Sequence, residues 1–185
     1  ILRKVTMNDA HDLFINWASD IKTNEYLTFK CHDNEETTKK VISYWLKKYE
    51  ENGFEWCIEI KDTKEVIGVI SANTSYKYNT LEIGYSISSK YWNKGYTTEA
   101  VKTIIDYLFN ECNYNIIEAV IPSNNIGSIK VAEKCGMKLE ATLKDRYKNI
   151  VEYKYRKQKY LLELDNESVK NTAKEKVIEK YNRFY

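Results

Sequence analysis

The sequence predicts a mixed α/β (α+β) domain in which helices flank a central sheet. Two kinds of periodicity support this. Residues 81–87 alternate apolar and polar side chains as a strand does, whereas residues 41–49 and 100–108 repeat apolar side chains every three or four positions, as a helix does. The expected order is β-α-α-β-β-β-α-β-α-β-β, which interleaves strands and helices. The chain has 185 residues, enough for one domain with a substantial core.

The first half of the chain is expected to hold a strand, two helices and three further strands. Thr6 and Asp9 form a pattern similar to a capping box, which predicts a helix start. Gly53 follows the second helix and is expected to end it. Polar residues 61–65 separate two strand-like runs and predict a hairpin. The expected ranges are a strand at 1–5, helices from 10 and around 41–49, and strands at 54–60, 66–72 and 81–87.

In the second half, a polar loop at 88–99 leads into a strongly amphipathic helix. Pro122 is expected to end the next strand, and Gly136 to end the helix after it. The expected ranges are a helix at 100–108, a strand at 116–121, a helix at 124–135, and strands at 137–141 and 151–164.

The tail, residues 165–185, has a different pattern from the rest. Apolar side chains recur every four residues with Lys and Glu between them, which predicts an amphipathic helix. We therefore divide the chain into a domain at 1–164 and a helical extension at 165–185. The extension is expected to pack on its own domain or on a second copy in a homodimer.

Composition and charge exclude several classes of protein. Apolar residues make up 43% and charged residues 30%, which is typical of a soluble globular domain and excludes collagen-like and wholly disordered chains. The net charge of +2 indicates no basic field for nucleic acid. No apolar run approaches the ~18 residues of a membrane helix, so we expect no membrane partner. The 4 widely spaced Cys and the 2 His predict free thiols, a cytoplasmic protein and no metal site.

The polar segment 88–99 has the most chemical content. A strand, a loop with glycine and a helix start form a common anion site, because the first helical amides lack intrahelical partners and carry partial positive charge. Gly95 would let the backbone approach a phosphate closely; alternatively, it only eases a tight turn. The sequence contains neither G-x-x-x-x-G-K-[ST] nor G-x-G-x-x-G, which excludes the P-loop and dinucleotide-binding classes.

Three motifs, in this order, resemble those of the GNAT N-acetyltransferases, particularly the ribosomal-protein-alanine N-acetyltransferase-like branch. Residues 91–100 (YWNKGYTTEA) resemble the acetyl-CoA pyrophosphate loop, and residues 81–87 (LEIGYSI) resemble the fourth strand. Residues 125–128 (NIGS) with 133–137 (EKCGM) match a third motif. The resemblance covers 1–164. It implies the GNAT fold, a mixed, mostly antiparallel sheet with a splayed cleft between its fourth and fifth strands, and acetyl-CoA as co-substrate.

The resemblance also implies how acetyl-CoA would be bound. The pantetheine arm would pair with the strand edge near Ile87, Ser88 and Ser89, and Asn125 would bond the arm or the acetyl end. Lys130 could reach a phosphate, or simply lie on a solvated helix face, and the same holds for Lys134. The backbone amides expected to hold the pyrophosphate belong to Asn93, Lys94, Gly95, Tyr96, Thr97 and Thr98.

Acetyl transfer to an amine needs a base for the ammonium, a polarised thioester carbonyl and a proton for the thiolate. Glu82 is the expected base, directly or through a water, because it points away from the apolar face of its strand; alternatively it is a surface carboxylate. Ser128 is expected to serve the leaving thiol, or is an ordinary helix hydroxyl. Ala132 stands where many GNAT enzymes carry a catalytic Tyr, and Thr97 where the family prefers Gly or Ala.

The expected activity is acetyl-CoA-dependent N-acetyl transfer to a primary amine, either a protein N-terminus or a small molecule, by direct attack in a ternary complex. Tyr26, Leu27 and Phe29, between the first two helices, and Tyr85 are expected to contact this acceptor. One alternative is a catalytically weak GNAT-like module that binds acyl-CoA or a partner protein. Another is nucleic-acid binding through the basic stretch at 144–159.

Overall fold

A seven-stranded sheet in the order β1-β2-β3-β4-β5-β7-β6 forms the centre of the computed structural model, which describes residues 1–50, 54–75, 79–144 and 152–158. The strands are β1 (Leu2–Lys4), β2 (Phe54–Glu59), β3 (Val66–Ser75), β4 (Thr80–Ile87), β5 (Ile116–Pro122), β6 (Lys138–Leu143) and β7 (Glu152–Gln158). The β4–β5 pair is parallel and every other neighbouring pair is antiparallel. The predicted mixed, mostly antiparallel sheet is confirmed.

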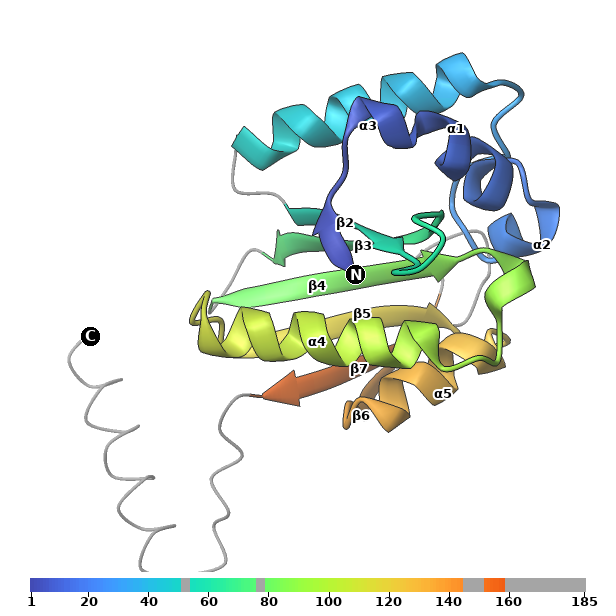
Figure 1. Cartoon of the computed structure of the whole chain (residues 1–185). Coiled ribbons are helices and arrows are strands. Elements are labelled where there is room, and N and C mark those ends of the chain that lie inside the picture. The colour runs from blue at the N-terminus through green and yellow to red at the C-terminus, as the bar shows by residue number, and fades with distance from the viewer. Residues whose placement is uncertain (51–53, 76–78, 145–151, 159–185) are drawn as a thin grey trace, which may run out of the picture.

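Helices cover both faces of the sheet (Figure 1). On one face lie α1 (Ala10–Leu13), α2 (Ile21–Asn24) and α3 (Glu35–Glu50), and on the other lie α4 (Tyr96–Asn110) and α5 (Ile126–Lys134). None of the helices in the described ranges combines the length and the apolar character that crossing a membrane requires.

The predicted elements are present, with shifted ends and one omission. The first predicted helix is broken into short helical segments, and α2 was not predicted. The helix predicted around 41–49 begins earlier, at Glu35, because Asn34 Oδ1 accepts the Thr37 N–H at 3.0 Å and caps it. Gly53 and the predicted helix at 165–185 lie outside the described residues, and the last strand is described only over Glu152–Gln158.

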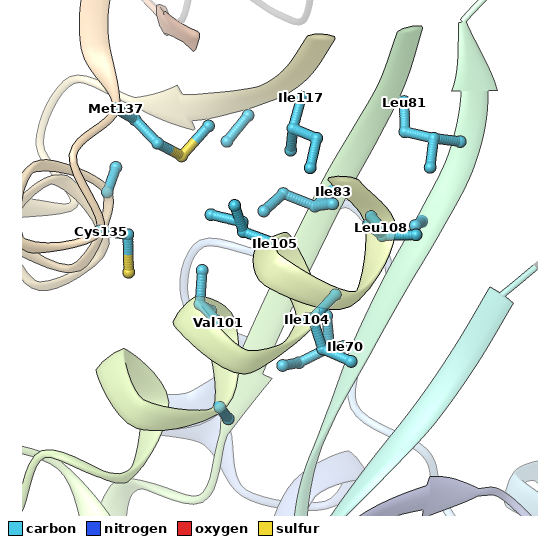
Figure 2. Close-up of a cluster of buried hydrophobic side chains, with 14 of the residues drawn as sticks. Ile70, Leu81, Ile83, Val101, Ile104, Ile105, Leu108, Ile117, Cys135 and Met137 are labelled. Carbon is cyan, nitrogen blue, oxygen red and sulfur yellow. The ribbon is translucent and has the colours of Figure 1, made fainter. Parts of the chain in front are cut away.

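The main core lies between α4 and the sheet (Figure 2). Leu81 and Ile83 of β4 and Ile117 of β5 pack against the inner face of α4, and each is at most 3% exposed. Fully burying a side chain of this size stabilises the fold by roughly 1.5–3 kcal/mol. A second cluster, under α1 and α3 on the other face, contains Val5, Leu13, Trp17, Ile42 and Val69. The two cores hold β2 and β3 from both sides.

Gly68 of β3 lies where the neighbouring strand leaves no room for a side chain. A Cβ added there would overlap the Ser86 carbonyl oxygen and lie 2.8 Å from Ile87 Cα, and both are backbone atoms of β4. We therefore expect Gly68→Ala to lower the free energy of unfolding by about 2–4 kcal/mol in urea denaturation. Gly127→Ala is the control, since its Cβ would meet only Asn125 Oδ1 at 3.7 Å. Equal stability of the two variants would contradict this packing.

Glu55 of β2 is a buried carboxyl whose burial cost is offset only weakly by a nearby cation. It is 5% exposed, and Lys48 Nζ lies 4.0 Å from its Oε1. Burial raises the pKa of Glu55 from 4.5 to about 7, although the positive charge of Lys48 lowers it by a smaller amount. Because the folded state holds this proton where the unfolded state releases it, stability falls as the pH rises from about 4.5 to 7.

Glu55→Gln is therefore expected to raise the free energy of unfolding by about 1–3 kcal/mol at pH 8, and by much less near pH 4.5. Chemical denaturation across this pH range measures the difference. Glu36→Gln is the control, because the side chain of Glu36 is 72% exposed and its substitution should change stability by less than about 0.5 kcal/mol at either pH. A pH-independent effect of Glu55→Gln would contradict the assigned burial cost.

Candidate active site

The candidate site is the gap that opens between β4 and β5. The two strands pair only from Thr80 with Ile116 to Glu82 with Glu118, whereas β4 pairs with β3 over its whole length. The Ser88 N–H donates to the Ile67 carbonyl at 2.8 Å. By the alternation of an antiparallel pair, the N–H and C=O groups of Tyr85 and Ile87 then point away from β3, toward the gap. The predicted splaying of these two strands is confirmed, and one side of the gap is the edge of β4.

The start of α5 forms the other wall. Asn125 caps this helix, since its Oδ1 accepts the Ser128 N–H at 3.1 Å. Tyr85 reaches across from β4, and its hydroxyl donates to the Ser128 carbonyl at 2.8 Å. Burial raises the pKa of Tyr85 well above its usual value, so the phenol stays protonated. Asn125, Ser128 and Tyr85, predicted separately, therefore meet in one place.

The loop before α4 has the geometry of an anion site. Asn93 and Gly95 both have positive φ, 61° and 87°, and Gly95 is the N-cap of α4. No side chain caps this helix. The amides of Tyr96, Thr97 and Thr98 occupy its first turn and have no partner within the helix. They offer three N–H donors and the positive end of the helix dipole.

Asp20 and Thr23, which the sequence analysis missed, hold the segment just after the end of β4. The Ser89 N–H donates to Asp20 Oδ2 at 3.1 Å and to Thr23 Oγ1 at 2.9 Å, and the Thr23 hydroxyl donates to Asp20 Oδ2 at 2.6 Å. Burial acts to raise the pKa of Asp20, but the hydrogen bonds from Thr23, Ser89 and Lys22 bring it down to about 2. An N-cap pattern at Asp20 was the available signal, since its carboxylate accepts the Lys22 N–H.

This anchoring changes which atoms of the predicted strand edge are free. The amides of Ser88 and Ser89 donate within the protein, and Trp92 Nε1 donates to the Ile87 carbonyl at 2.9 Å. The N–H groups that face the gap belong to Tyr85 and Ile87. Contacts of Ile87, Ser88 and Ser89 with acetyl-CoA stay predictions.

Glu82 lies at the vertex of the gap, in the last paired position of β4 and β5. Its side chain is on the face opposite Leu81 and Ile83, beside Asn73 of β3 and Glu118 of β5. Glu118 is 4% exposed and receives Arg156 Nε at 2.9 Å and Lys154 Nζ at 2.8 Å. Burial would raise the pKa of Glu118, but Lys154 and Arg156 lower it.

The basic stretch at 144–159 does not form one exposed surface in its described part. Lys154 and Arg156 pair with Glu118 and Glu140, whereas Lys157 points to the other face and donates to the Cys135 carbonyl at 2.8 Å. These three cations therefore pair within the protein, whereas Lys144 is exposed and the other cations of the stretch lie outside the described residues.

The predicted acceptor loop lies at the far end of β4 from Glu82. The loop follows α2, and Thr23 of α2 accepts the Ser89 N–H just beyond the end of β4. Glu82 lies five residues before Ile87, or about 17 Å away along the strand. Phe29 packs edge-on against Trp17 with ring centroids 5.4 Å apart, Leu27 packs on the second core, and Tyr26 is half-buried. The structure thus gives Leu27 and Phe29 a packing role, and their contact with an acceptor stays a prediction.

Two positions on α5 complete the predicted set. Lys130 is exposed, as either interpretation of it requires. Ala132 is fully buried in the main core, so this position offers no side chain to the cleft. Across the described residues, no group of three or more His, Cys, Asp or Glu side chains could hold a metal ion.

Comparison with known proteins agrees with this geometry. The model of the Acetyltransferase (GNAT) domain matches residues 1–138. A relative in sequence is the uncharacterized N-acetyltransferase YoaA of Bacillus subtilis (strain 168), which is 30% identical over 155 residues, or 83% of this chain and 88% of the relative. Among solved structures, a GNAT-family acetyltransferase from Bacillus anthracis has a TM-score of 0.78 and 25% identity, covering 85% of this chain and 93% of its own.

Two more distant structures show the fold alone. The ribosomal-protein-S5-alanine acetyltransferase from Vibrio fischeri has a TM-score of 0.72 and 22% identity, over 85% of this chain and 92% of its own. The microcin C7 self-immunity acetyltransferase MccE was solved in complex with acetyl-CoA and AMP. It has a TM-score of 0.76 and 19% identity, over 85% of this chain and 91% of its own.

The positive φ of Gly95 gives a test of the loop. A Cβ there would meet nothing within 4 Å, so Gly95→Ala adds no clash and changes only the preferred backbone angles. We expect Gly95→Ala to cost about 1–2 kcal/mol of stability and to weaken CoA binding, measured by denaturation and calorimetry. Gly95→Asn should lose less, because Asn tolerates this conformation, as Asn93 already shows. Equal losses in both variants would contradict a backbone cause.

Proposed function

The chain belongs to the GNAT family of acetyltransferases, and we propose that it transfers the acetyl group of acetyl-CoA to a primary amine by direct attack in a ternary complex. The domain match and the N-acetyltransferase relatives identify an acetyl-CoA-dependent acetyltransferase. The nature of the acceptor, the order of events and the residue roles are the proposed part, and they rest on the cleft between β4 and β5.

One observation supports the proposal above the others. The unpaired edge of β4 begins at the vertex with Glu82, and the loop that follows this strand leads to the uncapped start of α4. A ligand with an anionic end and an amide-containing arm fits this arrangement, because the helix amides favour phosphate and the strand edge pairs with amides. Acetyl-CoA has both parts. Lys94 and the amides of Tyr96, Thr97 and Thr98 would hold its pyrophosphate, and Asn125 Nδ2 would donate to its arm.

The chemistry assigned to the chain follows from these positions. The N–H groups of Tyr85 and Ile87, which face the gap, would donate to the thioester carbonyl oxygen and stabilise the negative charge that forms on it. The amine nitrogen forms the new C–N bond and the C–S bond breaks. Ser128 on the opposite wall is the proposed proton donor to the thiolate.

Glu82 is the proposed acceptor of the ammonium proton. It lies three residues from Tyr85, or about 10 Å along the strand, so a water is expected to carry the proton over part of this distance. Glu82 shares this face of the sheet with Glu118, Glu140 and Glu152 and with the cations Lys138, Lys154 and Arg156. Because Glu82 forms no ion pair with a described residue, its carboxylate can attract a cationic amine. Either a protein N-terminus or a small-molecule amine meets this requirement.

The buried Ala132 favours a second candidate, a module that binds acyl-CoA with little turnover, since no phenol can act from that position. Release of free thiol from acetyl-CoA, measured across a panel of N-terminal peptides, polyamines and amino sugars, separates the two. Thiol release with at least one amine is expected. Binding of CoA without release for every amine would support the module.

Glu82→Gln keeps the size of the side chain and removes the base. At saturating acceptor we expect kcat to fall by about 10²–10⁴, with little change in CoA affinity. The loss should shrink as the pH rises, because more of the amine is then already neutral. Glu140→Gln is the control, as Glu140 lies on the same face but pairs with Arg156. An unchanged kcat for Glu82→Gln would exclude Glu82 as the base.

A further inference from the structure

We propose that Glu65 and Tyr91 form a clamp that positions Lys94 for the phosphates of CoA. Neither Glu65 nor Tyr91 belongs to the predicted site. Tyr91 ends the helical turn that follows β4 (Ser89–Tyr91), and Glu65 immediately precedes β3. The Tyr91 hydroxyl donates to Glu65 Oε2 at 2.6 Å, which joins segments 26 residues apart. The inference rests on the use of acetyl-CoA and not on the identity of the acceptor.

Both ends of the clamp are fixed by backbone hydrogen bonds. The Ile60 N–H donates to the Glu65 carbonyl at 2.9 Å, and the Lys64 N–H donates to the Ile60 carbonyl at 2.9 Å, which closes the turn between β2 and β3. The Tyr91 N–H donates to the Ser88 carbonyl at 2.9 Å. The hydrogen bond between the side chains therefore fixes the direction of the Tyr91 ring as well as its position.

The ring of Tyr91 in turn holds two residues of the phosphate loop. Lys94 Nζ lies 4.9 Å from the centre of the Tyr91 ring, and the Tyr96 ring lies 6.0 Å from it. Lys94 is exposed and forms no salt bridge with any residue in the described ranges. An aromatic face attracts an ammonium group without neutralising it, so the charge and the N–H donors of Lys94 stay available to a phosphate.

Glu65 strengthens this arrangement. Its carboxylate accepts the hydrogen bond of Tyr91 and so makes the ring more electron-rich, which favours the ammonium on its face. The hydrogen bond to Glu65 is also the main cause that raises the pKa of Tyr91 to about 12, with burial and the carboxylate charge contributing. The phenol therefore remains a donor at neutral pH. A carboxylate in direct contact with Lys94 would instead compete with the phosphate.

Binding of CoA to the full chain, measured by isothermal titration calorimetry without any acceptor, tests the clamp. Lys94→Met should weaken binding roughly tenfold, and Tyr91→Phe and Glu65→Gln roughly threefold to tenfold each. In the double variant Tyr91→Phe/Lys94→Met, the loss should stay close to that of Lys94→Met alone, because residues that act through one another are not additive. Tyr44→Phe and Lys102→Met, on the exposed surfaces of α3 and α4, are the matched controls.

Thermal unfolding of each variant separates positioning from general stability. Variants that melt like the wild type but bind CoA more weakly support the clamp. Additive losses in the double variant, or a lower melting temperature with unchanged CoA binding, would overturn it. A wild-type chain that binds no CoA would overturn the use of acetyl-CoA as well, whereas CoA binding without transfer to any amine would overturn only the proposed acceptor chemistry.

Discussion

The structure depends on how far β4 stays paired with β5. The two strands share only three partnered positions, ending at Glu82 and Glu118, while β3 and β7 hold the outer sides of both strands throughout. Buried backbone groups are nearly always paired in native proteins. A strand edge in the middle of a sheet that lacks a strand partner therefore suits a ligand that completes the pairing. The packing of α4 and α5 beneath the gap keeps the two halves of the sheet together where the strands themselves do not.

The segment that connects this edge to α4 is tethered twice. Asp20 and Thr23 hold Ser89 from one layer of helices, and Glu65 holds Tyr91 from the turn between β2 and β3. Between these tethers and Gly95, the loop reaches α4 with its first amides uncapped. A loop that is already ordered loses less conformational entropy when a ligand binds, so we expect these hydrogen bonds to favour ligand binding at the loop.

The sequence predicted the parts of this arrangement that have a period or a local motif. The strands, α3, α4 and α5 repeat apolar side chains, and the phosphate loop stands out by its glycine and its helix start. By contrast, α2 is only one turn long and has no measurable period. The contact of Asp20 with Ser89 joins residues 69 positions apart, which no local pattern encodes. Likewise, the basic stretch at 144–159 looked continuous because its partners Glu118 and Glu140 come from other strands.

The vertex of the cleft shows how a sheet can give different roles to two adjacent carboxylates. Glu82 and Glu118 are register partners on neighbouring strands and share one face. Glu118 is bound by Arg156 and Lys154, which lower its pKa and occupy its oxygens. A carboxylate held in this way is a poor proton acceptor, because accepting a proton would break its ion pairs. Glu82 forms no ion pair with any described residue, so at the vertex it is the better placed of the two to exchange a proton with an acceptor.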